Sequence, residues 1–281
     1  MNISRSLALL VTAAVIPATP ALADEAQDRE AMMRDRITVG VGAIYGPSYD
    51  GSDDYVISPI PIVQGRVKGI TISPRPAGLA LDVIPDAPDA KIGFALGPVA
   101  TISRNRANQI KDPVVRAAGK LDTAVELGAS GGVSAYRLLN PYDSLTLGAD
   151  VKWDVAGAYG GMTWAPSITY ITPVSKAALV TLALSAKHID DDYADYYYSV
   201  SPAQSNASGL PQFQAKGGWE SVSATMLVGY DLSGDLRDGG FALFSIASYS
   251  RMLGDSKDTP YTSLRGDADQ WLAGLGVAYS F

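Results

Sequence analysis

The chain has 281 residues, of which 18% are charged, and a formal net charge of −7 at neutral pH. An acidic chain lacks the basic stripe that nucleic-acid binding requires, and the absence of cysteine excludes disulfides, thiolate catalysis and cysteine-based metal sites. Hydrophobic residues nevertheless make up 47% of the sequence, a high content for an exported water-soluble protein.

The first residues have the pattern of a secretory signal. Arg5 precedes an apolar run, and Ala21 and Ala23 are small residues at the two positions that a signal peptidase reads. The run is too short to span a bilayer, so we prefer a cleaved signal to a membrane anchor. We therefore expect a signal peptide at 1–23, a charged periplasmic tail at 24–36 and an outer-membrane β-barrel at 37–281.

From Ile37 onward, apolar residues alternate with small or polar ones. In 144–155, for example, one face carries Leu145, Leu147, Ala149, Val151, Trp153 and Val155. Alternation by itself fits a soluble β-sandwich as well as a membrane barrel. Segments of about ten residues favour the barrel, because a tilted membrane strand needs that length and because aromatic residues near the segment ends suit interfacial girdles.

The sequence predicts an all-β fold, an antiparallel transmembrane barrel of about twelve strands. The expected strands are 37–45, 55–63, 66–73, 77–84, 91–103, 120–135, 144–156, 161–172, 177–188, 218–231, 239–251 and 270–281. Short and long connections alternate, which is typical of periplasmic turns and extracellular loops and places both termini in the periplasm. Four prolines crowd 55–84, where we expect bulges or a shifted register.

The chain ends on a strand whose last residue is aromatic. Trp271, Tyr279 and Phe281 share the expected lipid face of this strand, which would close the barrel against the first one. A terminal phenylalanine on such a strand is similar to the signal read by the outer-membrane insertion machinery. We therefore interpret these three residues as an assembly signal.

Charged residues alternate onto the opposite face of two neighbouring expected strands. By parity the lumen would hold Lys120, Asp122, Glu126, Asp150, Lys152 and Asp154. Mixed signs suit internal ion pairs as well as an ion path. About twelve strands enclose more space than side chains fill unaided but less than a porin, so a narrow or loop-plugged pore is possible.

The segment HIDDDYADYYY, 188–198, is the best candidate for chemistry. A histidine beside aspartates at a barrel rim suits a surface protease, but parity directs His188 toward lipid, so we expect no enzyme. The possible surface recognition loop comprises Asp190, Asp191, Asp192, Tyr196, Tyr197 and Tyr198. These tyrosines either form that surface or belong to a strand extension that packs over the barrel mouth, which we favour. Asp50, Asp53 and Asp54, like the second aspartate run, could bind a divalent cation weakly but lack the spacing of a calcium loop.

Three stretches resemble the MipA/OmpV family of Gram-negative outer-membrane proteins. They are YDGSDDYVISPIP at 49–61, YYYSVSPAQSNASGLPQF at 196–213 followed by Gly217-Gly218-Trp219, and GLGVAYSF at the end. The resemblance implies a barrel that links murein synthases and lytic transglycosylases at the outer membrane. The resemblance is also compatible with other roles of family members, as surface antigens, adhesins or contributors to membrane permeability. The resemblance implies no active-site motif, and so no catalytic residue or cofactor.

These observations lead to one functional hypothesis and one alternative. We expect a non-enzymatic scaffold of the cell outer membrane, in contact with membrane lipids or lipopolysaccharide and possibly with a lytic transglycosylase and a murein synthase. The alternative is a narrow channel for small solutes. The loop 189–217 discriminates between them, because a plug favours the scaffold and an open lid favours the channel.

Overall fold

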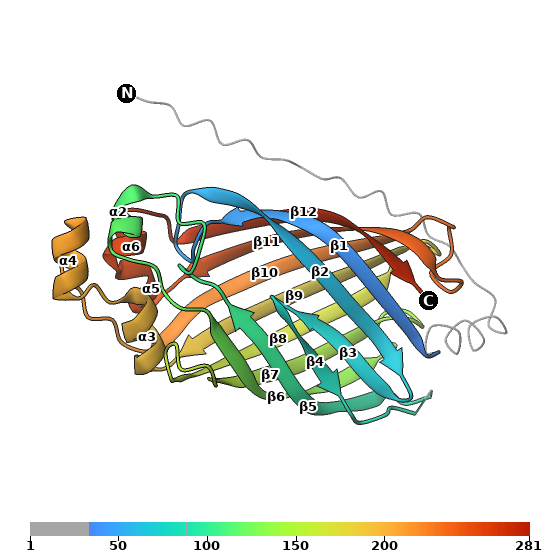
Figure 1. Cartoon of the computed structure of the whole chain (residues 1–281). Coiled ribbons are helices and arrows are strands. Elements are labelled where there is room, and N and C mark those ends of the chain that lie inside the picture. Colours follow the sequence, from blue (N-terminus) through green and yellow to red (C-terminus); the bar gives the residue numbers. More distant parts are fainter. Residues whose placement is uncertain (1–33, 88) are drawn as a thin grey trace.

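Twelve antiparallel strands close into a barrel, in which each strand pairs with its neighbours in sequence and β1 pairs with β12 (Figure 1). The computed structural model describes residues 34–87 and 89–281. The expected all-β barrel fold is therefore confirmed. The expected signal peptide and residues 24–33 of the expected tail lie outside the described residues.

The strands have eleven or more residues, except for one short hairpin. Their bounds are β1 Arg36–Pro47, β2 Tyr55–Val67, β3 Ile70–Arg75, β4 Gly78–Asp82, β5 Ile92–Ser103, β6 Ala124–Tyr136, β7 Ser144–Asp154, β8 Met162–Pro173, β9 Ala178–Ile189, β10 Gly218–Asp231, β11 Gly240–Met252 and β12 Asp269–Ser280. The helices are α2 Pro113–Ala117, α3 Asp191–Tyr198, α4 Pro202–Ser208, α5 Gly254–Asp258 and α6 Pro260–Ser263.

The last strand closes the barrel against the first strand. The β1–β12 register runs from Thr38 opposite Ser280 to Tyr45 opposite Ala273, and the Phe281 N–H donates to the Ile37 carbonyl at 2.8 Å. Closure satisfies the backbone groups that an edge would otherwise expose to lipid.

The outer surface is an apolar belt between two sets of aromatic residues. Leu275 is 70% exposed and Val41 58%, as expected where lipid replaces water as the solvent. One set contains Tyr45 with Tyr55 and Tyr249 with Trp271; at the other end, Phe241, Tyr279 and Phe281 stack edge to face. No helix of the described residues is long and apolar enough to cross a membrane.

The two ends of the barrel differ. At the long-loop end lie 48–54, 104–123, 155–161, 190–217 and 253–268, which carry the helices (Figure 1). At the short-turn end lie 68–69, 83–91, 137–143, 174–177 and 232–239, together with the start of β1 and the C-terminus. The candidate recognition loop, 190–198, therefore lies at the long-loop end.

Strand boundaries at the β2–β3 turn and at the start of β6 each differ by four residues from the sequence-based expectation. β2 continues to Val67 and turns at 68–69 instead of 64–65, so the hairpin that follows is short. β6 begins at Ala124 instead of 120, because α2 and its loop occupy the preceding residues. The Asp112 carboxylate starts α2 by accepting the N–H groups of Val114 and Val115 at 2.8 and 2.9 Å.

Candidate functional site

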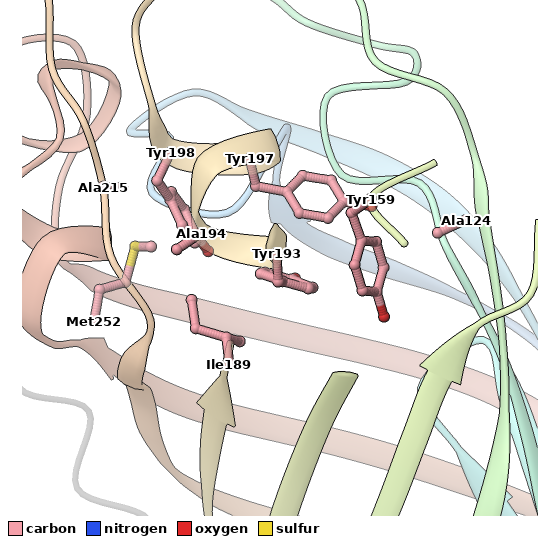
Figure 2. Packing of buried hydrophobic residues seen from close by; sticks show 9 residues of the cluster. All are labelled: Ala124, Tyr159, Ile189, Tyr193, Ala194, Tyr197, Tyr198, Ala215 and Met252. Atoms are coloured by element: carbon pink, nitrogen blue, oxygen red, sulfur yellow. The ribbon is translucent and has the colours of Figure 1, made fainter. Parts of the chain in front are cut away.

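The barrel mouth at the long-loop end is filled by α3 and its tyrosines. The Asp190 carboxylate caps the helix by accepting the Tyr193 N–H at 2.9 Å. Tyr193, Tyr197 and Tyr198 are at most 2% exposed and pack with Tyr159, Ile189 and Met252 (Figure 2). We call the cluster formed by α3 and Tyr159 the plug.

An ion pair joins the plug to the barrel wall. Lys187 on β9 lies 3.0 Å from Glu220 on β10, and its ammonium also donates to the Tyr193 hydroxyl at 2.6 Å. The Tyr198 hydroxyl donates to Glu220 at 2.7 Å. The Glu220 side chain is only 5% exposed, so its charge is compensated by bonds to wall and plug together.

A second network lies on the neighbouring wall. Glu126 on β6 forms an ion pair with Lys152 on β7 and accepts hydrogen bonds from Thr101 at 2.6 Å and from Tyr159 at 2.9 Å. Lys152 also donates to Thr101 at 2.9 Å. Because Tyr159 belongs to the plug, this network too couples the wall to the plug.

Deeper in the lumen, a third ion pair crosses from one strand pair to another. Arg75, at the tip of the β3–β4 hairpin, donates to Asp150 on β7 at 2.6 and 3.2 Å and to the Ser130 hydroxyl on β6 at 3.1 Å. Two parallel bonds to one carboxylate fix the guanidinium plane. The hairpin tip is thereby held toward β6 and β7.

The Asp50 side chain, in the 48–54 loop, is exposed to solvent, but protein surrounds its carboxyl closely enough for Glu220, Lys187 and Glu126 to act on it. Burial and the nearby Glu220 carboxylate raise the pKa of Asp50 to about 6, an effect that Lys187 only partly offsets. Burial also raises the pKa of the Tyr159 and Tyr193 hydroxyls, as do the carboxylates of Glu126 and Glu220, respectively. Both phenols therefore remain neutral, so Tyr159 donates to Glu126 and Tyr193 accepts from the Lys187 ammonium.

A second layer covers the plug from outside. The Arg106 guanidinium, 1% exposed, lies 3.8 Å from the centre of the Tyr261 ring and donates to the Tyr197 carbonyl at 3.1 Å. Arg265 pairs with Asp112, and this contact holds the pKa of Asp112 below its usual value although burial acts to raise it. The loops 104–123 and 253–268 thus contact each other and cover α3.

The predicted lumen charges divide into two groups. Glu126, Asp150 and Lys152 lie on the lumen face of their strands and are ion-paired. Lys120 and Asp122 lie in the exposed loop that precedes β6, because that strand starts later than expected. Asp154 ends β7 and accepts the N–H groups of Ala156, Tyr159 and Gly160.

The predicted recognition loop is largely interior. Asp190 caps α3, Asp191 and Asp192 are exposed in its first turn, and Tyr197 and Tyr198 are buried in the plug. Tyr196 is half-buried, and its hydroxyl accepts the Asp122 N–H at 2.8 Å. The tyrosines pack over the mouth, as the favoured alternative had it, but from a helix.

Several residues of the site were absent from the sequence-based set. Glu220, Tyr159, Thr101 and Arg75 carry no local signal beyond strand parity, and their partners lie 22 to 75 residues away in the chain. His188 lies on the outer face as predicted, with its ring 5.5 Å from Trp164 and 5.4 Å from Trp219. Trp271, Tyr279 and Phe281 are 61, 37 and 73% exposed on the lipid face.

Neither aspartate run forms a metal site within the described part of the chain, where no group of three or more potential ligands converges. Asp50, Asp191 and Asp192 are all exposed, and the Asp191 carboxylate accepts the Gly217 N–H at 2.7 Å. What the assembled groups can do chemically is hold the plug in place by charge and hydrogen bonding.

Comparison with known proteins gives one family. The model of a family described as MltA-interacting protein MipA matches residues 39–281, which is most of the chain. No curated protein matches the chain significantly.

Solved barrels show distant similarity. An outer membrane channel from Pseudomonas putida F1 is 13% identical, with a TM-score of 0.44, and the alignment covers 88% of this chain and 96% of that one. The CymD monoaromatic hydrocarbon channel is 8% identical, with a TM-score of 0.36 and coverages of 92 and 90%. The outer membrane protein OprD from Pseudomonas aeruginosa is 12% identical, with a TM-score of 0.27 and coverages of 89 and 94%.

Proposed function

The chain belongs to the MltA-interacting protein MipA family and is an outer-membrane β-barrel, and from this premise we propose that it is a non-enzymatic scaffold of the cell envelope. Its partner is a lytic transglycosylase of the MltA type, and a murein synthase joins the same assembly. The short-turn end and both termini face the periplasm, where these enzymes meet murein.

The observation that carries the proposal is the plugged mouth. The buried tyrosines of the plug are tied to the wall: Tyr193 and Tyr198 by Lys187 and Glu220, and Tyr159 by Glu126. A second layer covers them. A channel that opens readily would need this interior to rearrange, whereas a scaffold benefits from rigidity. The lone histidine faces lipid, which supports a function without acid–base chemistry.

The short-turn end offers a contact surface for the partner. Leu139 is 82% exposed, Val174 59% and Leu232 54%, each in a different turn at that end. Exposed apolar residues at neighbouring positions are a common feature of protein interaction sites. We assign the transglycosylase contact to these turns.

A binding measurement tests the proposal. Purified barrel in bilayer discs is immobilised, and a soluble MltA-type lytic transglycosylase is passed over it. We expect saturable binding that Leu139→Asp weakens by about 1 kcal/mol or more and that Leu264→Asp leaves unchanged, because Leu264 is equally apolar and 58% exposed but lies at the long-loop end. Absence of saturable binding, or equal loss with both variants, contradicts the proposal.

A narrow channel for small solutes is the second candidate. Below the plug, the lumen face of β8 to β10 carries small polar residues such as Ser167, Ser185 and Ser223 that are only half-buried, which favours water contact there. Planar bilayers distinguish the two functions. Steady conductance whose ion preference shifts with Glu220→Gln supports the channel, and a silent bilayer supports the scaffold.

A further inference from the structure

The barrel wall is incompletely paired between β2 and β3. Their register comprises only Gly65 with Ile72, Arg66 with Thr71 and Val67 with Ile70. Within the described residues, 55–64 of β2 have no strand partner on the side away from β1, and 73–75 of β3 have none on the side facing β2. In Figure 1 the short β3 and β4 stop well short of the end of β2 at which that strand begins. We call this unpaired stretch the open seam.

Two prolines on β2 line the open seam. The Ile37 carbonyl accepts the Phe281 N–H, so odd-numbered residues of β1 bond to β12 and even-numbered ones to β2. Through the β1–β2 register, even-numbered residues of β2 bond back to β1. Pro59 and Pro61 are odd-numbered, so the N–H groups that they lack would have faced the open seam.

A third proline faces the open seam from β3. The pairing of Gly65 with Ile72 makes even-numbered residues of β3 the ones that face β2, and Pro74 is one of them. Proline cannot donate to a ladder, so neither edge is a good template for another strand. The Tyr55 carbonyl, at the upper end of the seam, accepts the Lys111 ammonium at 2.5 Å. The prolines therefore interrupt the backbone hydrogen-bond ladder at the open seam and make it unsuited to the addition of another strand.

Apolar side chains continue from the lipid face through the open seam into the lumen. Ile57 is 70% exposed and Val63 40% on the outer rim, while Ile60 and Ile62 point inward and are half-buried. The apolar lumen patch consists of Ile44, Ile60, Ile62, Phe244, Ile246 and Leu272.

Glycines on β12 make room for this patch. A Cβ added at Gly276 would lie 2.2 Å from the Phe244 ring, and one added at Gly274 would lie 2.6 Å from Ile44 and 3.1 Å from Ile246. Neither buried hydrophobic cluster of the plug contains a residue of the patch. The opposite wall is charged, with Arg75 paired to Asp150 and Lys152 paired to Glu126.

Arg75 also explains why the seam stays open. Its bonds to Asp150 and Ser130 draw the hairpin tip toward β6 and β7, away from β2. Ala77 in the adjoining turn has a φ of 49°, a conformation that residues with a Cβ adopt at a cost. The hairpin is thus held apart from β2 by the lumen contacts of its tip.

We propose that the open seam is a lateral entrance through which the acyl chain of a membrane amphiphile passes from the bilayer onto the apolar lumen patch. The occupant follows from continuity, because the rim of the seam belongs to the same apolar surface that contacts lipid. Acyl chains are the ligands that adjoin this rim, whereas the plug covers the axial approach. This function goes beyond that of a scaffold and does not depend on it.

Single cysteines test the entrance, since the chain has none of its own. Ile62→Cys, Pro61→Cys and Thr225→Cys barrels in lipid vesicles react with a maleimide carried on an acyl chain. Pro61 is the lipid-facing positive control. Thr225 is the matched lumen control, because its hydroxyl bonds to Ser248 at 2.7 Å on a wall where β10 is paired on both sides.

We expect Ile62→Cys to react at least about tenfold faster than Thr225→Cys, because a fully paired wall excludes an acyl chain. Added dodecanoic acid should slow the maleimide reaction of Ile62→Cys and leave the reaction rate of Pro61→Cys unchanged. Equal rates at the two lumen positions, slow or fast, overturn the lateral entrance, as does a lack of competition by the fatty acid. Ile60→Cys replaces Ile62→Cys if the latter does not give folded barrel on gels.

Discussion

Glu220 bonds to two parts of the molecule at once, because it accepts from Lys187 on the wall and from Tyr198 in the plug. Asp150 and Glu126 are likewise bound by groups that neutralise them. When a buried charge loses its partner, it remains removed from water but no longer has the ion pair that offset the cost of that removal. At the scale of single residues, the plug is therefore most sensitive to the removal of one member of a pair.

We expect Lys187→Met to lower the free energy of unfolding by about 3 kcal/mol, because it leaves the Glu220 carboxylate without its cation. The measurement is urea unfolding in lipid, followed by heat-modifiable migration. Arg251→Gln is the control, because Arg251 pairs with Asp269 on the exposed outer rim, where solvent screens the pair and its loss costs little stability. Equal costs for the two variants contradict a buried anchoring pair.

Asp50 gives the plug a pH dependence. Its pKa of about 6 lies above the value of 3.8 in the unfolded chain, so folding favours the protonated form, and the stability it contributes at low pH is lost as the pH rises through about 6. Asp50→Asn should stabilise the barrel at pH 7 to 8 by about 1 kcal/mol or less, since solvent contact screens the carboxylate. Below pH 4 the variant and the parent should unfold alike. A difference that grows on acidification contradicts this sign.

Among the elements, α3 and β12 are held by different kinds of contact: α3 packs inside the barrel mouth, whereas β12 is a strand of the barrel wall. The helix is short and bears its apolar side chains where the wall offers acceptors and rings, so tertiary contacts maintain it. The strand pairs fully on both sides and carries the terminal aromatic residues outward. Changes in α3 should therefore affect the stability of the folded barrel, and changes at the end of β12 should affect its assembly.

Removal of Phe281 should lower the yield of assembled barrel while secretion stays intact. The ring is 73% exposed to lipid and stacks only on Tyr279, so its loss removes little core packing from the folded state. Pulse labelling followed by heat-modifiable migration separates assembly from export. Phe241→Ala, which removes another ring that stacks on Tyr279, is the control that should assemble normally. Parent-like assembly without Phe281 would rule out the terminal signal.

For the whole molecule, the distribution of connections predicts the orientation. Long loops and helices gather at one end, and the start of β1, the C-terminus and the short turns lie at the other. In outer-membrane barrels, such asymmetry separates extracellular loops from periplasmic turns. The plug would then face the cell exterior, and the proposed partner surface the periplasm.

Cysteine labelling on intact cells tests this orientation. We expect Arg116→Cys and Asp258→Cys, both at exposed positions of the long-loop end, to react with an impermeant maleimide. Leu139→Cys, 82% exposed in a short turn, should react only after the outer membrane is permeabilised. The reverse pattern would invert the barrel in the membrane.

The sequence by itself determined the barrel, its twelve strands and their two faces. These properties are local, because alternation assigns each residue of a strand to lipid or lumen, and segment lengths and connections follow from the same pattern. The outward position of His188 and the lipid-facing row from Trp271 to Phe281 were predicted in this way. Parity likewise placed Glu126, Asp150 and Lys152 on the lumen face.

Only the tertiary structure decided which of these groups meet. Arg75 and Asp150 are 75 residues apart, and Glu126 and Lys152 are 26 apart, so their pairing depends on barrel register and tilt. The helical form of 191–198 and the open seam between β2 and β3 were likewise absent from any local pattern. Prolines in 55–84 indicated irregular pairing, but whether their missing N–H groups faced a neighbour or a gap depended on the strands beside them.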